Sequence, residues 1–231
     1  LKDEKNENEN VDKNLTKNDL NFEKKITIQN VSFSYEEKKV FALNNINIDI
    51  NKGTSLGIIG KSGSGKTTLV DILLGLLNPT EGKLIFNNVL TKEASQSFHG
   101  EIAYLPQEPI ILDEDIKTNV TLYSDKNNID HKRLLESLEK ANLRDVINNL
   151  PKKIDTILGE GGIRLSGGQN KRLALARAFY HGKNVVIMDE ATSSLDIESE
   201  NYIAEQIREL KGKFTIIIIS HHMNILKYCD K

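Results

Sequence analysis

Eight residues in the first third of the chain combine glycines, two lysines and hydroxyl side chains at a spacing suited to phosphate. Residues 60–67 read GKSGSGKT and match the pattern G-x-x-x-x-G-K-[ST]. The glycines allow successive backbone N–H groups to point inward around phosphate oxygens. We expect the Lys66 ammonium to reach the β- and γ-phosphates and the Thr67 hydroxyl to ligate Mg²⁺. The pattern predicts a nucleoside-triphosphate site made of Gly60, Lys61, Ser62, Gly63, Ser64, Gly65, Lys66, Thr67 and the adjoining Thr68.

Two adjacent carboxylates, Asp189 and Glu190, follow the apolar run Val185–Met188. Such a run has the length of a buried strand, and ligands of open parallel sheets collect at the carboxyl ends of the strands. We therefore expect both acids to face the phosphate loop, with Asp189 holding Mg²⁺ directly or through water. Glu190 is placed to orient or deprotonate an attacking water. Strands commonly end in acids that are only solvated, so this pair alone does not indicate catalysis. The phosphate loop upstream favours a catalytic role for Asp189 and Glu190.

A second glycine loop lies between these two motifs. Residues 165–169 read LSGGQ and precede a segment rich in Ala, Leu and Arg, which predicts a helix. Ser166 fits the N-cap position, and the N–H groups of Gly167 and Gly168 would form a second anion site. One nucleotide bound to one chain does not need two such loops. The alternative is a helix that is only capped at this position.

The elements that position these loops follow from the hydrophobic period. Segments 26–33 and 46–50 alternate apolar and polar residues, which predicts half-buried antiparallel strands with a one-residue slip near Asn30. Residues 56–59 predict a short buried strand, and a helix with one apolar face over 69–77 is expected after it. Further strands are expected at 84–86, 102–105, 185–189 and 214–220.

The pattern over 116–150 is helical, with Asp130 as a cap, and further helices should begin at Ser166 and near Asp196. The apolar stripe of the first of these segments is expected to consist of Leu134, Leu135, Leu138 and Ala141. Buried strands that alternate with helices predict an α/β fold. We expect a P-loop NTPase core with a mainly parallel sheet, an antiparallel β subdomain and an inserted α-helical subdomain at about residues 108–176.

The whole chain adds limits on partners and compartment. Its 31 Lys and Arg and 33 Asp and Glu give a formal net charge of -2, which argues against a nucleic-acid partner held by bulk charge. Cys229 is the only cysteine, so no internal disulfide can form and a reducing compartment is expected. No apolar run approaches the roughly 18 residues of a membrane helix, so we expect a soluble domain. Residues 1–23 are polar and begin with Leu1, which predicts a disordered linker before an excised, C-terminally truncated domain at 24–231.

A phosphate loop, an LSGGQ segment and an Asp-Glu strand end occur here in the order found in ABC ATPases, which this chain resembles from about Ile26 to Cys229. The resemblance implies an ATP and Mg²⁺ site in which Tyr35 stacks on adenine and Gln107 senses the metal. It also implies that residues 193–196 cross a dimer interface and that His221 contacts the γ-phosphate, with the adjacent His222 as the alternative. The catalytic residues that it implies are Lys66, Gln107, Glu190 and His221, and the metal ligands are Thr67, Gln107 and Asp189.

Two domains pack head to tail in this family. The resemblance thus implies a homodimer, or a heterodimer with a related domain, in which Ser166, Gly167, Gly168 and Gln169 contact the ATP of the partner. Segment 104–112 resembles the Q-loop of exporters, and segment 158–162 resembles their X-loop, although Gly161 stands where an Arg is usual. These segments imply the motor of an exporter at the cytoplasmic face of a bacterial inner membrane. A transmembrane domain on the same polypeptide would contact the cargo, for which the resemblance suggests a lipid-linked glycan.

Two other classes of protein remain as alternatives at this point. A soluble ABC ATPase of DNA repair, chromosome structure or translation would share the motifs, but such proteins typically carry coiled-coil insertions, a second cassette or basic patches. A GTPase would explain residues 16–19, which read TKND and resemble a guanine-reading motif. That segment precedes the phosphate loop and lies in the polar N-terminal region, which disfavours the GTPase.

Overall fold

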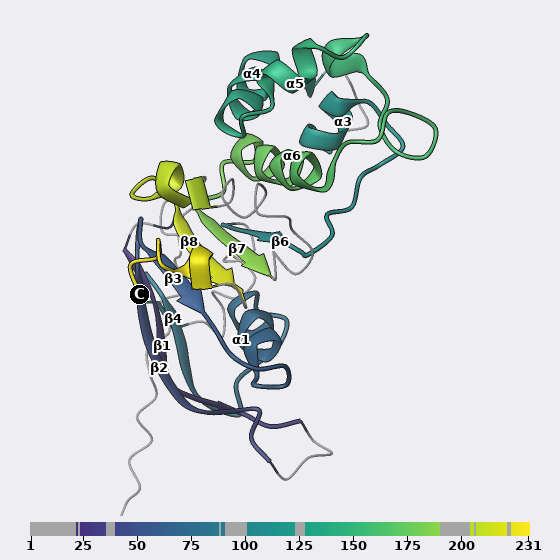
Figure 1. Cartoon of the computed structure of the whole chain (residues 1–231). Coiled ribbons are helices and arrows are strands. Elements are labelled where there is room, and N and C mark those ends of the chain that lie inside the picture. The colour runs from purple at the N-terminus through teal and green to yellow at the C-terminus, as the bar shows by residue number, and fades with distance from the viewer. Residues whose placement is uncertain are drawn as a thin grey trace, which may run out of the picture.

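The computed structural model describes residues 22, 24–35, 40–87, 89–90, 101–122, 128–189, 204–205, 207–220 and 223–231 (Figure 1). Several predicted features lie outside these residues. They are the linker apart from Phe22, the segment 16–19, Glu190, the segment 193–196 with the helix expected near Asp196, and the pair His221 and His222.

An antiparallel sheet has the strand order β2-β1-β4-β5. Its strands are β1 (Lys25–Phe33), β2 (Leu43–Asn51), β4 (Glu81–Phe86) and β5 (Val89–Leu90). The register of β1 on β2 shifts between Ile28 and Val31, and Asn30 takes a left-handed backbone with φ 50°. The predicted antiparallel strands and the slip near Asn30 are confirmed.

A second sheet is parallel throughout and has the order β3-β8-β7-β6. Its strands are β3 (Ser55–Ile58), β6 (Ile102–Leu105), β7 (Val185–Asp189) and β8 (Thr215–Ile219). The carboxyl ends of the four strands therefore meet at one edge of the sheet. This arrangement places the residues that follow β3 near the end of β7, as the sequence predicts.

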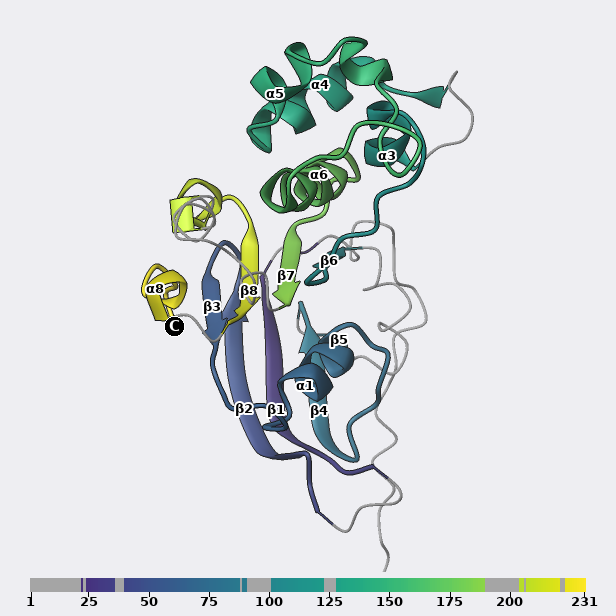
Figure 2. The same ribbon diagram turned by 45° about the vertical axis from the view of Figure 1, so that its right-hand side comes forward.

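Helices cover the parallel sheet on one side and α1 lies on the other, toward the antiparallel sheet (Figures 1 and 2). The helices whose bounds the structure describes are, in chain order, α1 (Lys66–Leu73), α3 (Ile116–Thr121), α4 (His131–Lys140), α5 (Arg144–Asn148), the 3-10 turn η2 (Lys153–Asp155), α6 (Gly167–Tyr180) and α8 (Met223–Leu226). Residues 204–205 and 207–210 are also helical. The group from α3 to α6 is the inserted α-helical part of the fold. Among the described residues, no helix combines the length and the apolar character needed to cross a bilayer.

Alternate residues of the central strands enter two different cores. Val186 and Met188 of β7 belong to the core shared with α3, α4 and α6. Val185 and Ile187 belong to the core shared with α1 and the antiparallel sheet. Both faces of the parallel sheet are thus buried, which is why its strands are apolar without alternation.

Two helical predictions need correction. The helix expected over 69–77 ends at Leu73, because Gly75 takes a left-handed backbone with φ 69°, and Leu76 is 68% exposed. Leu135 does not belong to the buried stripe of α4 and is 54% exposed, since it is turned about 100° from Leu134 around the helix axis. The cap predicted at Asp130 is confirmed, because its side chain accepts from the backbone N–H of Arg133.

Candidate active site

The phosphate loop connects β3 to α1 at the carboxyl edge of the parallel sheet. Gly65 is the N-cap residue of α1 and takes a left-handed backbone with φ 88°. A Cβ added at Gly65 would overlap the carbonyl oxygen of Ala42. Both the backbone angle and the close approach therefore require glycine at this position.

The loop encloses the ammonium group of Lys66. Nζ of Lys66 donates to the carbonyl oxygens of Gly60 and Lys61, each at 2.9 Å. Lys66 is also the first residue of α1, where the helix presents N–H groups and its partial positive charge. The loop thus gathers a cation and backbone donors at one point, which is the arrangement that binds phosphate.

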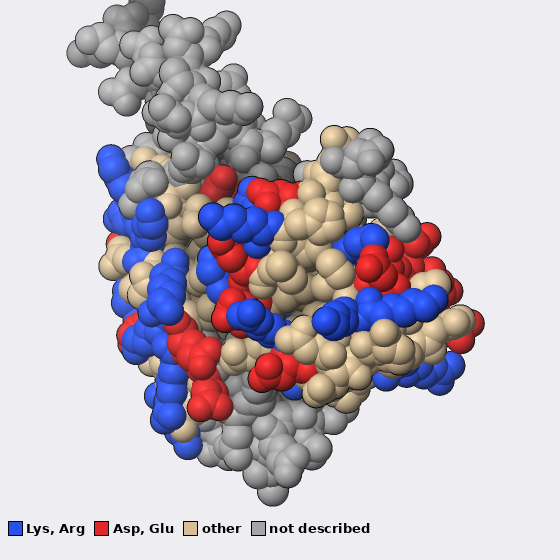
Figure 3. All heavy atoms as spheres, turned by 90° about the horizontal axis from the view of Figure 1, so that it is seen from above, with Lys and Arg blue, Asp and Glu red and all other residues tan. Residues whose placement is uncertain are grey.

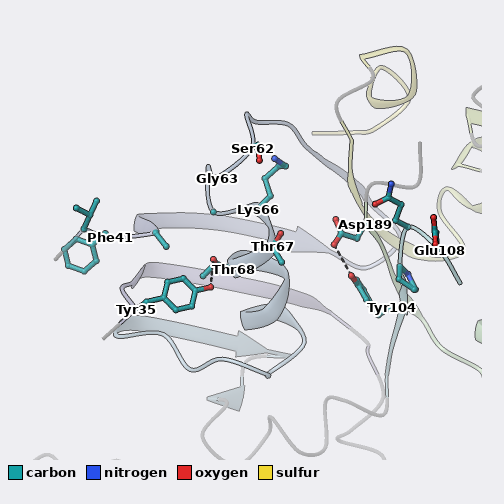
Figure 4. Close-up of a pocket in the computed structure, with 15 residues that line it drawn as sticks. Tyr35, Phe41, Ser62, Gly63, Lys66, Thr67, Thr68, Tyr104, Glu108 and Asp189 are labelled. Carbon is teal, nitrogen blue, oxygen red and sulfur yellow. Dashed lines mark hydrogen bonds between the residues drawn. The ribbon is translucent and has the colours of Figure 1, made fainter. Parts of the chain in front are cut away.

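A cavity of about 770 Å³ lies beside this loop (Figure 4). The loop forms one part of its wall, and the ends of β6 and β7 form another. Of the predicted binding and catalytic residues, the cavity brings together Tyr35, Ser62, Gly63, Gly65, Lys66, Thr67, Thr68, Gln107 and Asp189. Gly60, Lys61 and Ser64 complete the loop around Lys66, and Ser64 donates its backbone N–H to the carbonyl of Lys61.

Asp189 and Tyr104 meet at one end of the cavity. The Tyr104 hydroxyl donates to Oδ2 of Asp189 at 2.9 Å (Figure 4). Burial, followed by this hydrogen bond and the negative charge of Asp189, raises the pKa of Tyr104 to about 12. Burial and the charge of Asp189 also raise the pKa of Asp71 on α1. This end of the cavity is therefore negative and suited to a cation.

Three of the lining residues offer the ligands that Mg²⁺ prefers. Thr67 supplies a hydroxyl oxygen, Gln107 an amide oxygen and Asp189 a carboxylate, and all three line the same cavity. Hard oxygen donors of this kind, together with phosphate oxygens, are the usual surroundings of Mg²⁺ in nucleotide sites. The chemistry of the donor set therefore fits the ion that the sequence predicts.

Tyr35 lies toward the opposite end of the cavity from Asp189 (Figure 4). Its hydroxyl is 3.1 Å from Oγ1 of Thr68, and its ring makes an edge contact with Phe33, with the centroids 5.0 Å apart. The side chain stays 43% exposed. These contacts hold the ring in place and leave part of it accessible, as stacking on a base requires.

The LSGGQ residues lie at the start of α6, and none of them lines the cavity. Ser166 caps the helix in a capping box: the backbone N–H of Ser166 donates to Oε1 of Gln169 at 2.9 Å, and the backbone N–H of Gln169 donates to Oγ of Ser166 at 3.3 Å. Ser166 and Gly167 are exposed, and Gly168 is half-buried. The structure therefore places the predicted second anion site away from the cavity of the same chain.

Sequence reasoning missed two contributors to the site. The sequence predicts Tyr104 only as part of a strand and of a Q-loop segment, and it predicts Asp71 only as part of a helix. Tyr104 lies opposite Ile187 in the parallel pairing of β6 and β7, so Asp189 falls two residues further on the same side. The register that joins them cannot be read from either strand alone.

Comparisons with known proteins agree with this geometry. Residues 43–193 match the sequence model of the ABC transporter family. The chain is 36% identical over 208 residues to an ATP-dependent lipid A-core flippase of Ralstonia nicotianae, a match that covers 89% of this chain and 35% of that protein. The fold also matches the structure of a bacterial Atm1-family ABC exporter with ATP bound, with a TM-score of 0.76, 26% identity, and coverage of 90% of this chain and 36% of that one. The chain spans about a third of the length of these relatives, and it belongs to the ABC transporter family.

Proposed function

We propose that residues 24–231 form the ATP-binding and ATP-hydrolysing domain of an ABC exporter, with its helical subdomain at about 108–176. The observation that carries the proposal is that the Lys66 loop, Asp189 and Gln107 line one and the same cavity. Phosphate-binding and metal-binding chemistry meet there, as hydrolysis of a nucleoside triphosphate requires.

In this proposal the loop around Lys66 binds the β- and γ-phosphates, and Tyr35 supports the adenine. Thr67, Gln107 and Asp189 hold Mg²⁺, which neutralises charge on the phosphates when bound. Glu190 prepares a water for in-line attack, and His221, in preference to His222, stabilises the charge that develops on the transferred group. Glu190 and His221 follow β7 and β8, whose carboxyl ends lie at the same edge of the sheet as the loop.

The second anion site supports a site shared between two chains. Ser166 and Gly167 are exposed at the start of a 14-residue helix and do not reach the cavity of their own chain. We propose that they contact the ATP of a partner domain, in a homodimer or in a heterodimer with a related domain. Two-fold packing would complete both sites at once.

The relatives support export in preference to the alternatives. One relative is named as a flippase and the matched structure as an exporter, which favours a membrane role over DNA repair, chromosome structure, translation or a GTPase switch. We propose a transmembrane domain on the same polypeptide that contacts the cargo, with this domain at the cytoplasmic face of a bacterial membrane. Export of small molecules and flipping of a lipid-linked glycan both fit this proposal. Figure 3 shows Lys and Arg interleaved with Asp and Glu on the described part of one face, which does not favour a nucleic-acid partner there.

A complementation experiment tests hydrolysis and pairing together. Lys66→Ala and Ser166→Arg should each abolish phosphate release from ATP, because each breaks both sites of a homodimer. A mixed dimer has one site with Lys66 and Ser166 both intact. Random pairing makes about half of the dimers mixed, and one of the two sites in each mixed dimer is intact. If the two sites act independently, an equimolar mixture should therefore recover about a quarter of the unmutated activity.

Lys132→Ala on the outer side of α4 serves as the surface control and should retain full activity. A mixture as inactive as its two components would contradict the shared site. An unmutated chain without ATPase activity, alone or joined to its membrane domain, would contradict the proposed function itself.

A further inference from the structure

Tyr104 ties the ends of two neighbouring strands at the edge of the cavity. It belongs to β6, and its hydroxyl donates across the sheet to Oδ2 of Asp189, the last residue of β7 (Figure 4). Both residues line the cavity that holds the phosphate loop. The contact therefore joins the predicted metal ligand to a residue that has no place in the proposed mechanism so far.

The hydrogen bond restricts how Asp189 can turn. A carboxylate at a strand end can rotate about its terminal torsion with little resistance. A donor on Oδ2 fixes the plane of the group and leaves Oδ1 as the oxygen for a metal ion or its water. Mg²⁺ requires near-ideal octahedral geometry, so a ligand held in one orientation binds it better than one that must be ordered first.

We propose that Tyr104 is a positioning residue for the metal, which acts by holding the Asp189 carboxylate in the orientation that receives Mg²⁺ together with ATP. The inference rests on the proposed function, because it assigns a task within the same site. Outer hydrogen bonds to metal ligands typically change metal affinity by about 10- to 100-fold. The lower end applies here because Tyr104 is 41% exposed.

A purely structural role would give a different result from the same residue. If only the ring mattered, as packing at the end of β6, the loss of the hydroxyl would change nothing. Tyr104→Phe removes the hydroxyl and keeps the ring. Tyr228→Phe is the matched control, since it removes a phenol hydroxyl from a ring that packs against Arg208 and Lys227 and does not line the cavity.

The test is calorimetric titration of the chain with AMP-PNP, once with Mg²⁺ and once with excess EDTA. The quantity of interest is the affinity for AMP-PNP with Mg²⁺ divided by the affinity in EDTA. Tyr104→Phe should lower this ratio about tenfold and leave the affinity in EDTA within about twofold of the unmutated chain. Tyr228→Phe should leave both unchanged. Melting curves of the three proteins establish that each is folded.

Two results would overturn the inference while the proposed function stands. One is that Tyr104→Phe binds AMP-PNP as tightly as the unmutated chain in both conditions, which would mean that the hydroxyl has no role in binding. The other is an equal loss of affinity with and without Mg²⁺, which would mean that the hydroxyl acts on the nucleotide or the fold. An unmutated chain that does not bind AMP-PNP under either condition would overturn the proposed function and this inference with it.

Discussion

Replacing Asn119 with alanine should lower the free energy of unfolding by about 2 kcal/mol, although the residue lies outside the active-site cavity. The side chain is fully buried. Its Nδ2 donates to the carbonyls of Leu112, Glu114 and Asp115 at 3.0, 3.1 and 3.2 Å. Its Oδ1 accepts from the backbone N–H of Leu112 at 2.9 Å and from the guanidinium of Arg177 at 3.1 Å. These bonds join the segment before α3 to α3 itself and to α6.

The magnitude follows from the groups that lose a partner. Asp115 keeps the backbone bond from the N–H of Asn119. The carbonyls of Leu112 and Glu114 likewise keep backbone bonds, from the N–H groups of Glu114 and Leu158. The N–H of Leu112 loses its side-chain partner, which should cost about 1 kcal/mol, the low end of the range, because Leu112 is 37% exposed and water can reach it in part. The lost bond to Arg177 adds up to about 1 kcal/mol, since this guanidinium still donates to the backbone carbonyl of Asn119.

Urea unfolding followed by far-UV circular dichroism measures the effect. A loss of this size should move the midpoint down by about 1 M urea without a change in slope. Asn148→Ala is the matched control, because that asparagine is exposed at the end of α5, and its cost should stay within about 0.5 kcal/mol. A cost below about 1 kcal/mol for Asn119→Ala would refute the reasoning that these bonds hold the helical subdomain together.

Asp71→Asn should raise the melting temperature by about 1–2 °C at pH 7 and not at pH 3. Burial and the charge of Asp189 raise the pKa of Asp71 in the folded state. The ionised carboxylate therefore destabilises the fold above about pH 4, and it has no effect below the pKa values of both the folded and the unfolded state. Equal changes of melting temperature at the two pH values would contradict this account. Gly65→Ala should weaken AMP-PNP binding more than tenfold and unfold more readily than Gly63→Ala. Both positions have positive φ, but only at Gly65 would the new methyl group overlap the Ala42 carbonyl, whereas no described atom lies within 4 Å of the methyl position at Gly63. Equal losses in calorimetry and melting curves for the two variants would argue against the steric explanation.

The local sequence determined the features that depend on neighbours along the chain. The phosphate-loop pattern predicted a strand-to-helix turn because glycines and the first turn of a helix make that turn by themselves. The caps at Asp130 and Ser166 were predictable for the same reason, since each side chain bonds to a backbone N–H three residues further on. The parallel sheet followed from short apolar runs separated by helices.

The tertiary structure decided which distant residues meet. The bond between Tyr104 and Asp189 depends on the register of β6 on β7, and the contact of Tyr35 with Thr68 joins the antiparallel sheet to α1. The steric need for Gly65 arises from the carbonyl of Ala42, a neighbour only in the folded chain. None of these contacts has a local signal, because the strand pairing and the packing that create them come from burial of the whole core. The sequence thus determined the chemistry and the order of the elements, and the fold decided how the carboxylate, the lysine and the aromatic ring share one cavity.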